Sequence, residues 1–121
     1  MKGIGIDAVE VDRFRTVLRR TPGVATRLFT DGERAAGARR RDPSQRLAAR
    51  FAAKEAVMKA LGVGLGAFAF HDVEVVRAES GAPSLALRGR AASLAAARGV
   101  AGWRLSITHT EQTAQAIAVA L

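Results

Sequence analysis

The sequence predicts an α+β fold, a single domain in which a largely antiparallel sheet packs against one long helix. Several short stretches alternate apolar and polar residues with the period of a strand, and two pairs of them are joined by short turns. A longer stretch, residues 43–61, repeats its apolar residues with the period of a helix. The chain of 121 residues is 49% hydrophobic and shows no linker or internal repeat, so we expect residues 1–121 to share one core.

The first element is a strand over residues 2–10. One face of this strand carries Ile4, Ile6 and Ala8, and the residues of the other face are Gly3, Gly5, Asp7 and Val9. The two glycines leave open space beside Asp7, because glycine in a strand often marks the close approach of a ligand or of backbone.

Helix-capping patterns mark the next two elements. Asp12 is predicted to cap a helix that runs to about Arg20. Thr30, with Glu33 three residues later, predicts a capping box at the start of a second, short helix.

The long helix over residues 43–61 has the strongest signals. Asp42 is expected as its cap, Pro43 at its first position and Gln45 as the partner that closes a capping box. Gly62 follows the helix at the place where a left-handed residue is expected. Since the glycines of 62–66 follow a helix C-terminus, where the dipole repels anions, we interpret them as a cap and turn and reject a phosphate-binding loop.

The second half of the chain is predicted to contain two strand pairs and a short helix. Residues 70–89 form two strands around a turn at 79–82, and residues 90–99 form a helix that Gly99 stops. A closing strand pair follows at 103–110 and 114–121.

The net charge of +8 is concentrated in one segment. Residues 13–50 hold 11 arginines against three acidic residues, which accounts for the whole excess. Such a segment attracts an acidic protein, a phosphorylated substrate or nucleic acid, or it forms a solvated helical face. The few aromatic residues do not alternate with basic ones, which argues against nucleic acid. No apolar stretch reaches the ~20 residues of a membrane span, and the absence of cysteine suits a reducing cytoplasm.

A helical wheel places the charges of residues 43–61 on different sides of an apolar face. Glu55 and Lys59 share one flank, and Arg50 lies about 140° from Glu55 on the other. Lys54 falls within the apolar face, where its stem can pack while its ammonium reaches water. Glu55 and Lys59 are either an ordinary surface pair or part of a site.

Asp7 is the second unusual charge, because a carboxylate within a short strand is costly unless it is paired or binds a cation. One interpretation is a pair with an arginine at the end of the strand. The other is a hard metal ion: Mg²⁺ takes one or two protein carboxylates and completes its shell with water and phosphate. Asp7 and Glu55 would form such a pair, with Lys59 as a charge for a phosphate oxygen. His109, after a predicted strand, is either structural or a ligand contact.

Three motifs in this order resemble the holo-acyl-carrier-protein synthase family of 4'-phosphopantetheinyl transferases. They are GIGIDAVEVDRF at 3–14, RFAAKEAVMKALG at 50–62 and SITHT at 106–110. LFTDGE at 28–33 and FHDVEV at 70–75 are also similar to that family. The resemblance covers essentially the whole chain, and it implies a 4'-phosphopantetheinyl transferase-like fold.

The resemblance also implies a reaction and a set of site residues. The reaction is transfer of 4'-phosphopantetheine from coenzyme A to a serine of an apo-acyl carrier protein, with release of adenosine 3',5'-bisphosphate. Asp7 and Glu55 would bind Mg²⁺, Lys59 would be catalytic, and Arg13 would contact the acidic carrier protein. The residues implied to contact coenzyme A are Arg50, Lys54, Lys59 and His109. Small family members are homotrimers with sites between subunits, which would explain why Arg50 and Glu55 face apart.

Two alternatives remain at this point. A basic nucleic-acid-binding module would use the arginines of 13–50, and its binding would weaken steeply with salt. A non-catalytic subunit would dock a carrier protein without modifying it. The sequence also leaves open whether Glu55 or a water accepts the serine proton, and whether the carrier protein serves fatty acid or polyketide synthesis.

Overall fold

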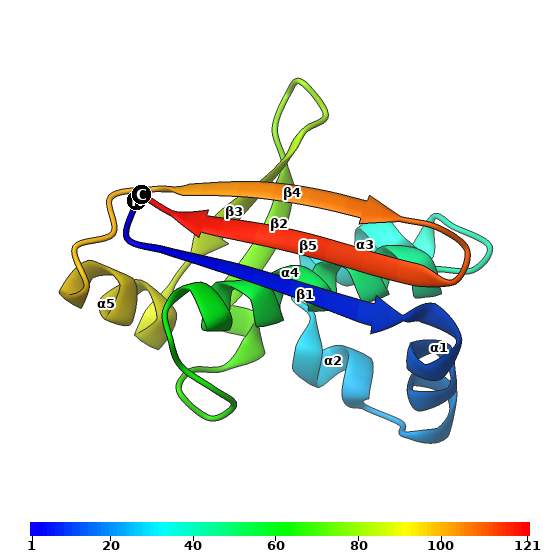
Figure 1. Cartoon of the computed structure of the whole chain (residues 1–121). Coiled ribbons are helices and arrows are strands. Elements are labelled where there is room, and N and C mark those ends of the chain that lie inside the picture. The colour runs from blue at the N-terminus through cyan, green and yellow to red at the C-terminus, as the bar shows by residue number, and fades with distance from the viewer.

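The computed structural model describes all of residues 1–121 (Figure 1). In chain order the elements are β1 (Gly3–Glu10), α1 (Val11–Arg20), α2 (Val24–Leu28), α3 (Asp31–Ala38), α4 (Ser44–Ala60), a 3-10 turn (Phe70–Asp72), β2 (Val73–Arg77), β3 (Pro83–Leu87), α5 (Gly89–Ala97), β4 (Trp103–His109) and β5 (Thr113–Ala120). No helix is long and apolar enough to cross a membrane.

Two antiparallel sheets form the strand layer. The larger has the order β1-β5-β4, so the N- and C-terminal strands pair, and β2 and β3 form a separate hairpin. Helix α4 packs along β1 and β5, and the hairpin's β3 lies against β4 with its tip projecting past the larger sheet (Figure 1). This confirms the predicted α+β fold with an antiparallel sheet against a long helix.

The close approach of α4 to β1 depends on two glycines. A Cβ at Gly3 would lie 2.0 Å from the carbonyl oxygen of Ala60, and one at Gly5 would lie 1.9 Å from that of Ala56. Only glycine leaves room for backbone this close. The prediction that these glycines leave open space beside Asp7 is therefore wrong, because the helix backbone fills that space.

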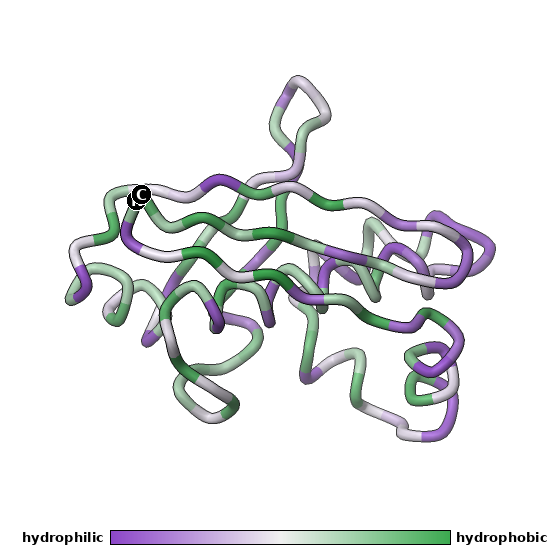
Figure 2. The backbone as a smooth tube through the Cα atoms, in the orientation of Figure 1, coloured by the Kyte–Doolittle hydropathy of each residue, from purple (hydrophilic) through white to green (hydrophobic).

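The opposite face of β1 is open. Ile4 and Ile6 are 58% and 57% exposed, and Ile117 of the neighbouring β5 is 38% exposed. Figure 2 shows the apolar residues of β1 and β5 running side by side along the larger sheet. We call Ile4, Ile6 and Ile117 the outer apolar face.

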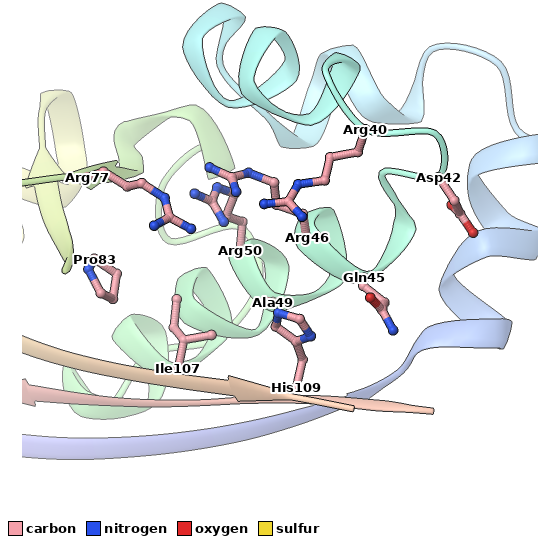
Figure 3. Close-up of a pocket in the computed structure, with 10 residues that line it drawn as sticks. All are labelled: Arg40, Asp42, Gln45, Arg46, Ala49, Arg50, Arg77, Pro83, Ile107 and His109. Atoms are coloured by element: carbon pink, nitrogen blue, oxygen red, sulfur yellow. The ribbon is translucent and has the colours of Figure 1, made fainter. Parts of the chain in front are cut away.

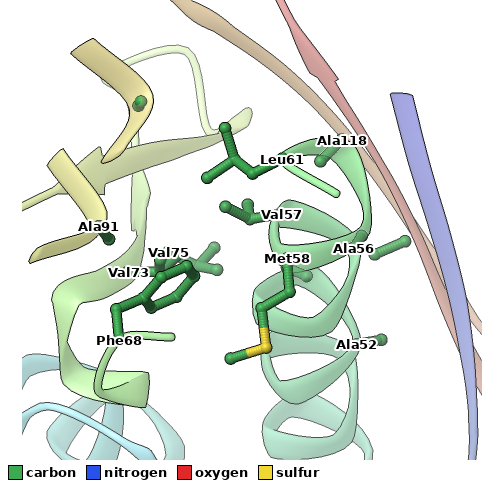
Figure 4. Close-up of a cluster of buried hydrophobic side chains, with 13 residues drawn as sticks. Ala52, Ala56, Val57, Met58, Leu61, Phe68, Val73, Val75, Ala91 and Ala118 are labelled. Atoms are coloured by element: carbon green, nitrogen blue, oxygen red, sulfur yellow. The ribbon is translucent and has the colours of Figure 1, made fainter. Parts of the chain in front are cut away.

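Helix α4 is the centre of the core. On one side of this helix, Val57, Met58 and Leu61 pack against Val73 of β2 and Ala91 of α5 (Figure 4). A second cluster joins the start of α4 to α1 and α2 through Phe14, Phe29 and Leu47. Because both clusters share α4, the orientation of this helix is determined along its whole length, and so is the direction of its charged side chains.

The helix ends agree only in part with the predicted caps. The Thr30–Glu33 capping box is present, and Gly62 has the left-handed φ of 69° that ends α4. Asp12 does not cap α1, which begins at Val11 without a side-chain cap. Its carboxylate instead accepts a hydrogen bond from Arg15.

The start of α4 also differs from the prediction. Helix α4 begins at Ser44 with Pro43 as its N-cap and without a side-chain cap, so Asp42 is not the cap and Pro43 is not the first helical residue. Asp42 Oδ1 still accepts a hydrogen bond from the backbone N–H of Ser44 at 3.0 Å. Gln45 does not close a capping box, because its side chain donates to the carbonyl of Thr110 instead. Helix α2 was not predicted: the Thr-Pro-Gly sequence before it reads as a stop, yet Gly23, at φ 87°, starts a new short helix.

Candidate active site

Asp7 and Glu55 line one groove of about 590 Å³ between β1, α1 and α4. Asp7 comes from β1 and Glu55 from α4, and the close packing of α4 at Gly5 brings the two elements together. The groove has aromatic walls, since Phe51 lies 5.3 Å from Phe14 and 5.6 Å from Phe70 between ring centres. The residues that define this carboxylate groove are Asp7, Arg13, Phe14, Phe51, Glu55, Leu65 and Phe70.

The two carboxylates differ in their partners. Lys59 Nζ lies 3.0 Å from Asp7 Oδ1 and also donates to the carbonyl oxygen of Ile6 at 3.0 Å. Glu55 makes no hydrogen bond or ion pair, so it does not form the surface pair with Lys59 that its spacing allows. Partial burial raises the pKa of Glu55, and the charge of Asp7 raises it further, while Lys59 opposes the shift.

The chemistry of this groove fits a hard divalent cation. No group of three or more His, Cys, Asp or Glu residues is arranged to hold a metal, so Glu10, which also lines the groove, does not form a three-residue site with Asp7 and Glu55. Mg²⁺ commonly uses so few protein ligands, because it keeps several waters and binds substrate phosphates. Burial first, and then the charge of Asp7, raise the pKa of Glu55, and a cation between Glu55 and Asp7 would oppose both effects.

A second group of polar side chains forms a pocket of about 180 Å³ on another side of α4 (Figure 3). Arg46 and Arg50 come from α4, Arg40 from the segment before it, Arg77 from β2 and His109 from the end of β4. Figure 3 shows the four guanidinium groups directed toward a common space. We call Arg40, Arg46, Arg50, Arg77 and His109 the arginine pocket.

The positive charges of the arginine pocket have no acidic partner. Asp42 lies at its edge, but its carboxylate binds Arg15 at 2.9 Å and the N–H of Ser44. Burial, and then the charge of Arg46, lowers the pKa of Arg50 to about 10. The Nε atoms of Arg46 and Arg50 are buried without a hydrogen-bond acceptor. Because buried donors are normally paired, this pocket has the properties of a site for an anion.

Lys54 belongs to neither site. Its side chain is fully buried, and its ammonium donates to Glu33 Oε1 at 2.8 Å, to the carbonyl of Phe70 at 3.1 Å and to that of Val73. The prediction that this ammonium reaches water is therefore wrong. A buried ammonium with three acceptors is also not placed to contact coenzyme A.

Comparison with known proteins identifies the family. Residues 3–120 match the sequence profile of the 4'-phosphopantetheinyl transferase superfamily. The chain belongs to this superfamily.

The sequence relatives of this transferase match it from end to end. A holo-[acyl-carrier-protein] synthase of Frankia alni is 52% identical over 118 residues, covering 98% of this chain and 95% of the relative. The enzyme of the same name from Desulforudis audaxviator is 48% identical over 120 residues, covering 98% and 92%. The protein is therefore an enzyme of the phosphopantetheinyl transferase class, as the motifs predict.

Solved structures share the fold of this transferase. The holo-[acyl-carrier-protein] synthase of Neisseria meningitidis has a TM-score of 0.89 and 31% identity, covering 100% of this chain and 98% of that one. The Helicobacter pylori enzyme, solved in complex with coenzyme A, has a TM-score of 0.83 and 29% identity, covering 98% and 99%. These likenesses confirm the fold that the resemblance implies.

The structure divides the predicted site residues of the transferase into two sets. Asp7, Glu55 and Arg13 line the carboxylate groove, with Lys59 bound to Asp7. Arg50 and His109 line the arginine pocket, in agreement with the wheel, on which Arg50 and Glu55 face apart.

Sequence reasoning missed four residues of these arrangements. Arg46 lies one helical turn before Arg50, and this spacing could have indicated it. Arg40 and Arg77 carry no comparable signal, because they reach the arginine pocket from separate elements. Glu33, the buried partner of Lys54, was predicted only as part of a capping box.

Proposed function

We propose that the protein is a holo-acyl-carrier-protein synthase. It transfers 4'-phosphopantetheine from coenzyme A to a serine of an apo-acyl carrier protein, requires Mg²⁺ and releases adenosine 3',5'-bisphosphate. The observation that supports this most is the presence of two complementary features in a member of this superfamily: a carboxylate pair suited to Mg²⁺ and a pocket of four arginines suited to phosphate. We further propose that residues 1–121 act as one transferase domain in the cytoplasm.

In the carboxylate groove, Asp7 and Glu55 would hold Mg²⁺, which when bound supplies positive charge to the pyrophosphate oxygens. Lys59, whose ammonium lies 3.0 Å from Asp7, adds a mobile charge for the same oxygens. The serine oxygen bonds to the phosphorus that carries pantetheine, and the bond from this phosphorus to the nucleotide phosphate breaks. The serine proton passes to Glu55 or to a water beside it.

The arginine pocket would bind the remaining phosphate of coenzyme A. The substrate carries a pyrophosphate and a separate phosphate on the ribose, and only the pyrophosphate reacts. If the carboxylate groove takes the reacting group, the arginine pocket is left for the ribose phosphate. Arg50 and His109 are the two predicted contacts there, and guanidinium groups are suited to phosphate because of their planar donors.

The position of the two sites supports a homotrimer. They lie on different sides of α4, so one chain does not surround a single coenzyme A with both. In a closed ring, the groove of one subunit can meet the arginine pocket of the next. The outer apolar face, where Ile4 is 58% exposed, offers a surface through which subunits can associate.

The carrier protein would dock beside the carboxylate groove. Arg13 is exposed and lines the groove, and Arg19 and Arg20 follow on the same helix. Leu65, an apolar residue that also lines the groove, is 73% exposed. An acidic protein with an apolar contact surface fits this combination of charges and apolar area.

Mass spectrometry of carrier proteins tests the proposal. The protein is incubated with coenzyme A, Mg²⁺ and several apo-carrier proteins, beside an established transferase as positive control. We expect one carrier to gain the mass of one phosphopantetheine. No gain on any carrier that the control modifies would contradict the proposal, and binding without modification would favour a docking subunit.

A further inference from the structure

Arg77 differs from the other cations of the arginine pocket in its origin. Arg46 and Arg50 lie on α4 and Arg40 just before it, whereas Arg77 is the last residue of β2, opposite Pro83 at the base of the hairpin turn. In Figure 3 its guanidinium points toward those of Arg46 and Arg50. The hairpin therefore adds a charge that α4 does not carry.

The position of the Arg77 side chain is set by the hairpin itself. Its NH1 donates a hydrogen bond to the carbonyl oxygen of Gly81 at 3.1 Å, and this is the only hydrogen bond that the side chain makes. Arg77 has no ion pair with any carboxylate. The remaining donors of its planar group are free to bind an acceptor in the pocket.

The charge of Arg77 acts on the same space as the charges of α4. It contributes to the lowered pKa of Arg46, after burial, and to that of Arg50. Four guanidinium groups that repel one another around one pocket are costly without a ligand, and an anion with more than one charge relieves more of this repulsion. A phosphate monoester carries about −1.5 to −2 charges at neutral pH, whereas each phosphate of a pyrophosphate diester carries about −1.

We propose that Arg77 is a specificity-determining residue that gives the arginine pocket its preference for a phosphate monoester dianion. This inference rests on the proposed function, and it names the part of coenzyme A to which Arg77 responds, namely the ribose phosphate. Arg77 contributes to recognition of coenzyme A against the otherwise identical molecule without that phosphate. It does not take part in the chemistry at the carboxylate groove.

Binding by calorimetry tests the inference, with coenzyme A and 3'-dephospho-coenzyme A as the two probes. Arg77→Gln should weaken binding of coenzyme A by about 10-fold, the loss of one charge-assisted contact, and change binding of the dephospho form by less than about 2-fold. Arg77→Lys keeps the charge without the planar donors, so its affinity for coenzyme A should lie between those of wild type and Arg77→Gln. Arg90→Gln, which removes an equally exposed charge from α5 outside the pocket, should change neither.

The outcomes separate this inference from the proposed function. A wild-type protein that does not bind coenzyme A would overturn the proposed function and this inference together. Wild-type binding with equal losses for both probes in Arg77→Gln, or with no loss for either, would overturn the inference alone. Melting temperatures of the variants should not fall below that of wild type, because Arg77 is exposed and Arg77→Gln removes a repelling charge.

Discussion

At the residue scale, the three cations of α4 after Ala49 show that surroundings decide what a charge does. Lys54 is buried and its three protons are all accepted, Lys59 is half exposed and pairs with Asp7, and Arg50 is buried without a carboxylate. Only Arg50 and Lys59 therefore keep donors for a ligand. Glu55 is an acidic residue of the same helix that also keeps its charge free for a ligand, since its pKa is raised and it makes no hydrogen bond or ion pair.

Glu55→Gln tests the carboxylate groove. The change removes a proposed metal ligand while keeping the shape, so we expect transfer to fall by at least about 100-fold. Quenched-flow or endpoint mass spectrometry measures it, with the exposed Glu111→Gln as the matched control. A near-normal rate in Glu55→Gln would remove Glu55 from the mechanism.

The stability of Glu55→Gln should follow the pKa shift. The folded-state pKa of Glu55 is raised, so any stability that it contributes is present at low pH and lost as pH rises through that pKa. Without metal at neutral pH, Glu55→Gln should therefore be at least as stable as wild type, and the difference should vanish below the unfolded pKa of about 4.3. Chemical unfolding with a chelator present measures this, and a less stable variant at neutral pH would contradict it.

Lys54→Met tests the buried ion pair. Removing the ammonium leaves the Glu33 carboxylate buried, so we expect the free energy of unfolding to fall by about 3–5 kcal/mol. Adding Glu33→Gln should recover part of the loss, because the unpaired charge is gone. Urea unfolding of both variants measures these changes, and an unchanged midpoint in Lys54→Met would show that the pair is dispensable.

At the element scale, the contact of β1 with α4 builds the carboxylate groove. Asp7 and Glu55 meet because the helix backbone lies directly on the strand at Gly3 and Gly5. The arginine pocket depends in the same way on the hairpin, which brings Arg77 to α4. Each site is thus located where two elements distant in sequence pack together.

Gly5→Ala tests the first of these contacts. The new Cβ would lie 1.9 Å from the carbonyl oxygen of Ala56, so strand and helix must separate. We expect a loss of about 1–3 kcal/mol of stability, as for overpacked cores, together with a weaker response of transfer to Mg²⁺. Gly64→Ala is the matched control, because nothing lies within 4 Å of its Cβ position. Equal stability of the two variants would contradict the close packing.

At the scale of the whole molecule, the proposed homotrimer would make the two sites of one chain half-sites. The carboxylate groove and the arginine pocket lie on different sides of α4, and the outer apolar face leaves Ile4, Ile6 and Ile117 partly exposed. The proposed ring of identical subunits would use all three features, because it would cover the apolar face and join each groove to a neighbouring pocket.

Mixing two impaired variants tests the shared site. Glu55→Gln keeps the arginine pocket and Arg50→Ala keeps the carboxylate groove, so a mixed ring contains one intact site among its three interfaces. Co-expressed variants purified through two different tags should recover about one third of the wild-type rate. At a limiting coenzyme A concentration, each variant alone should stay well below this rate, and no recovery in verified mixed rings would place each site within one chain.

Local patterns in the sequence determined most elements and the main chemistry. The capping box at Thr30, the glycine at 62 and the alternating strands depend on neighbouring residues, so they can be recognised without a structure. The ordered motifs around Asp7, Glu55 and His109 likewise indicated the family that the comparisons confirm. Local patterns were insufficient for α2, and for the start of α1, where Asp12 accepts a hydrogen bond from Arg15 instead of capping the helix.

Only the tertiary structure decided which charges are available to a ligand. The sequence could not show that Lys54 is buried against Glu33 while Arg50 has no acidic partner, nor that Arg77 joins Arg46 from across the chain. The physical reason is that the pairing and solvation of a charge depend on contacts between residues distant in sequence. Secondary structure follows short-range preferences, and the accessible charge of each site follows the packing of α4.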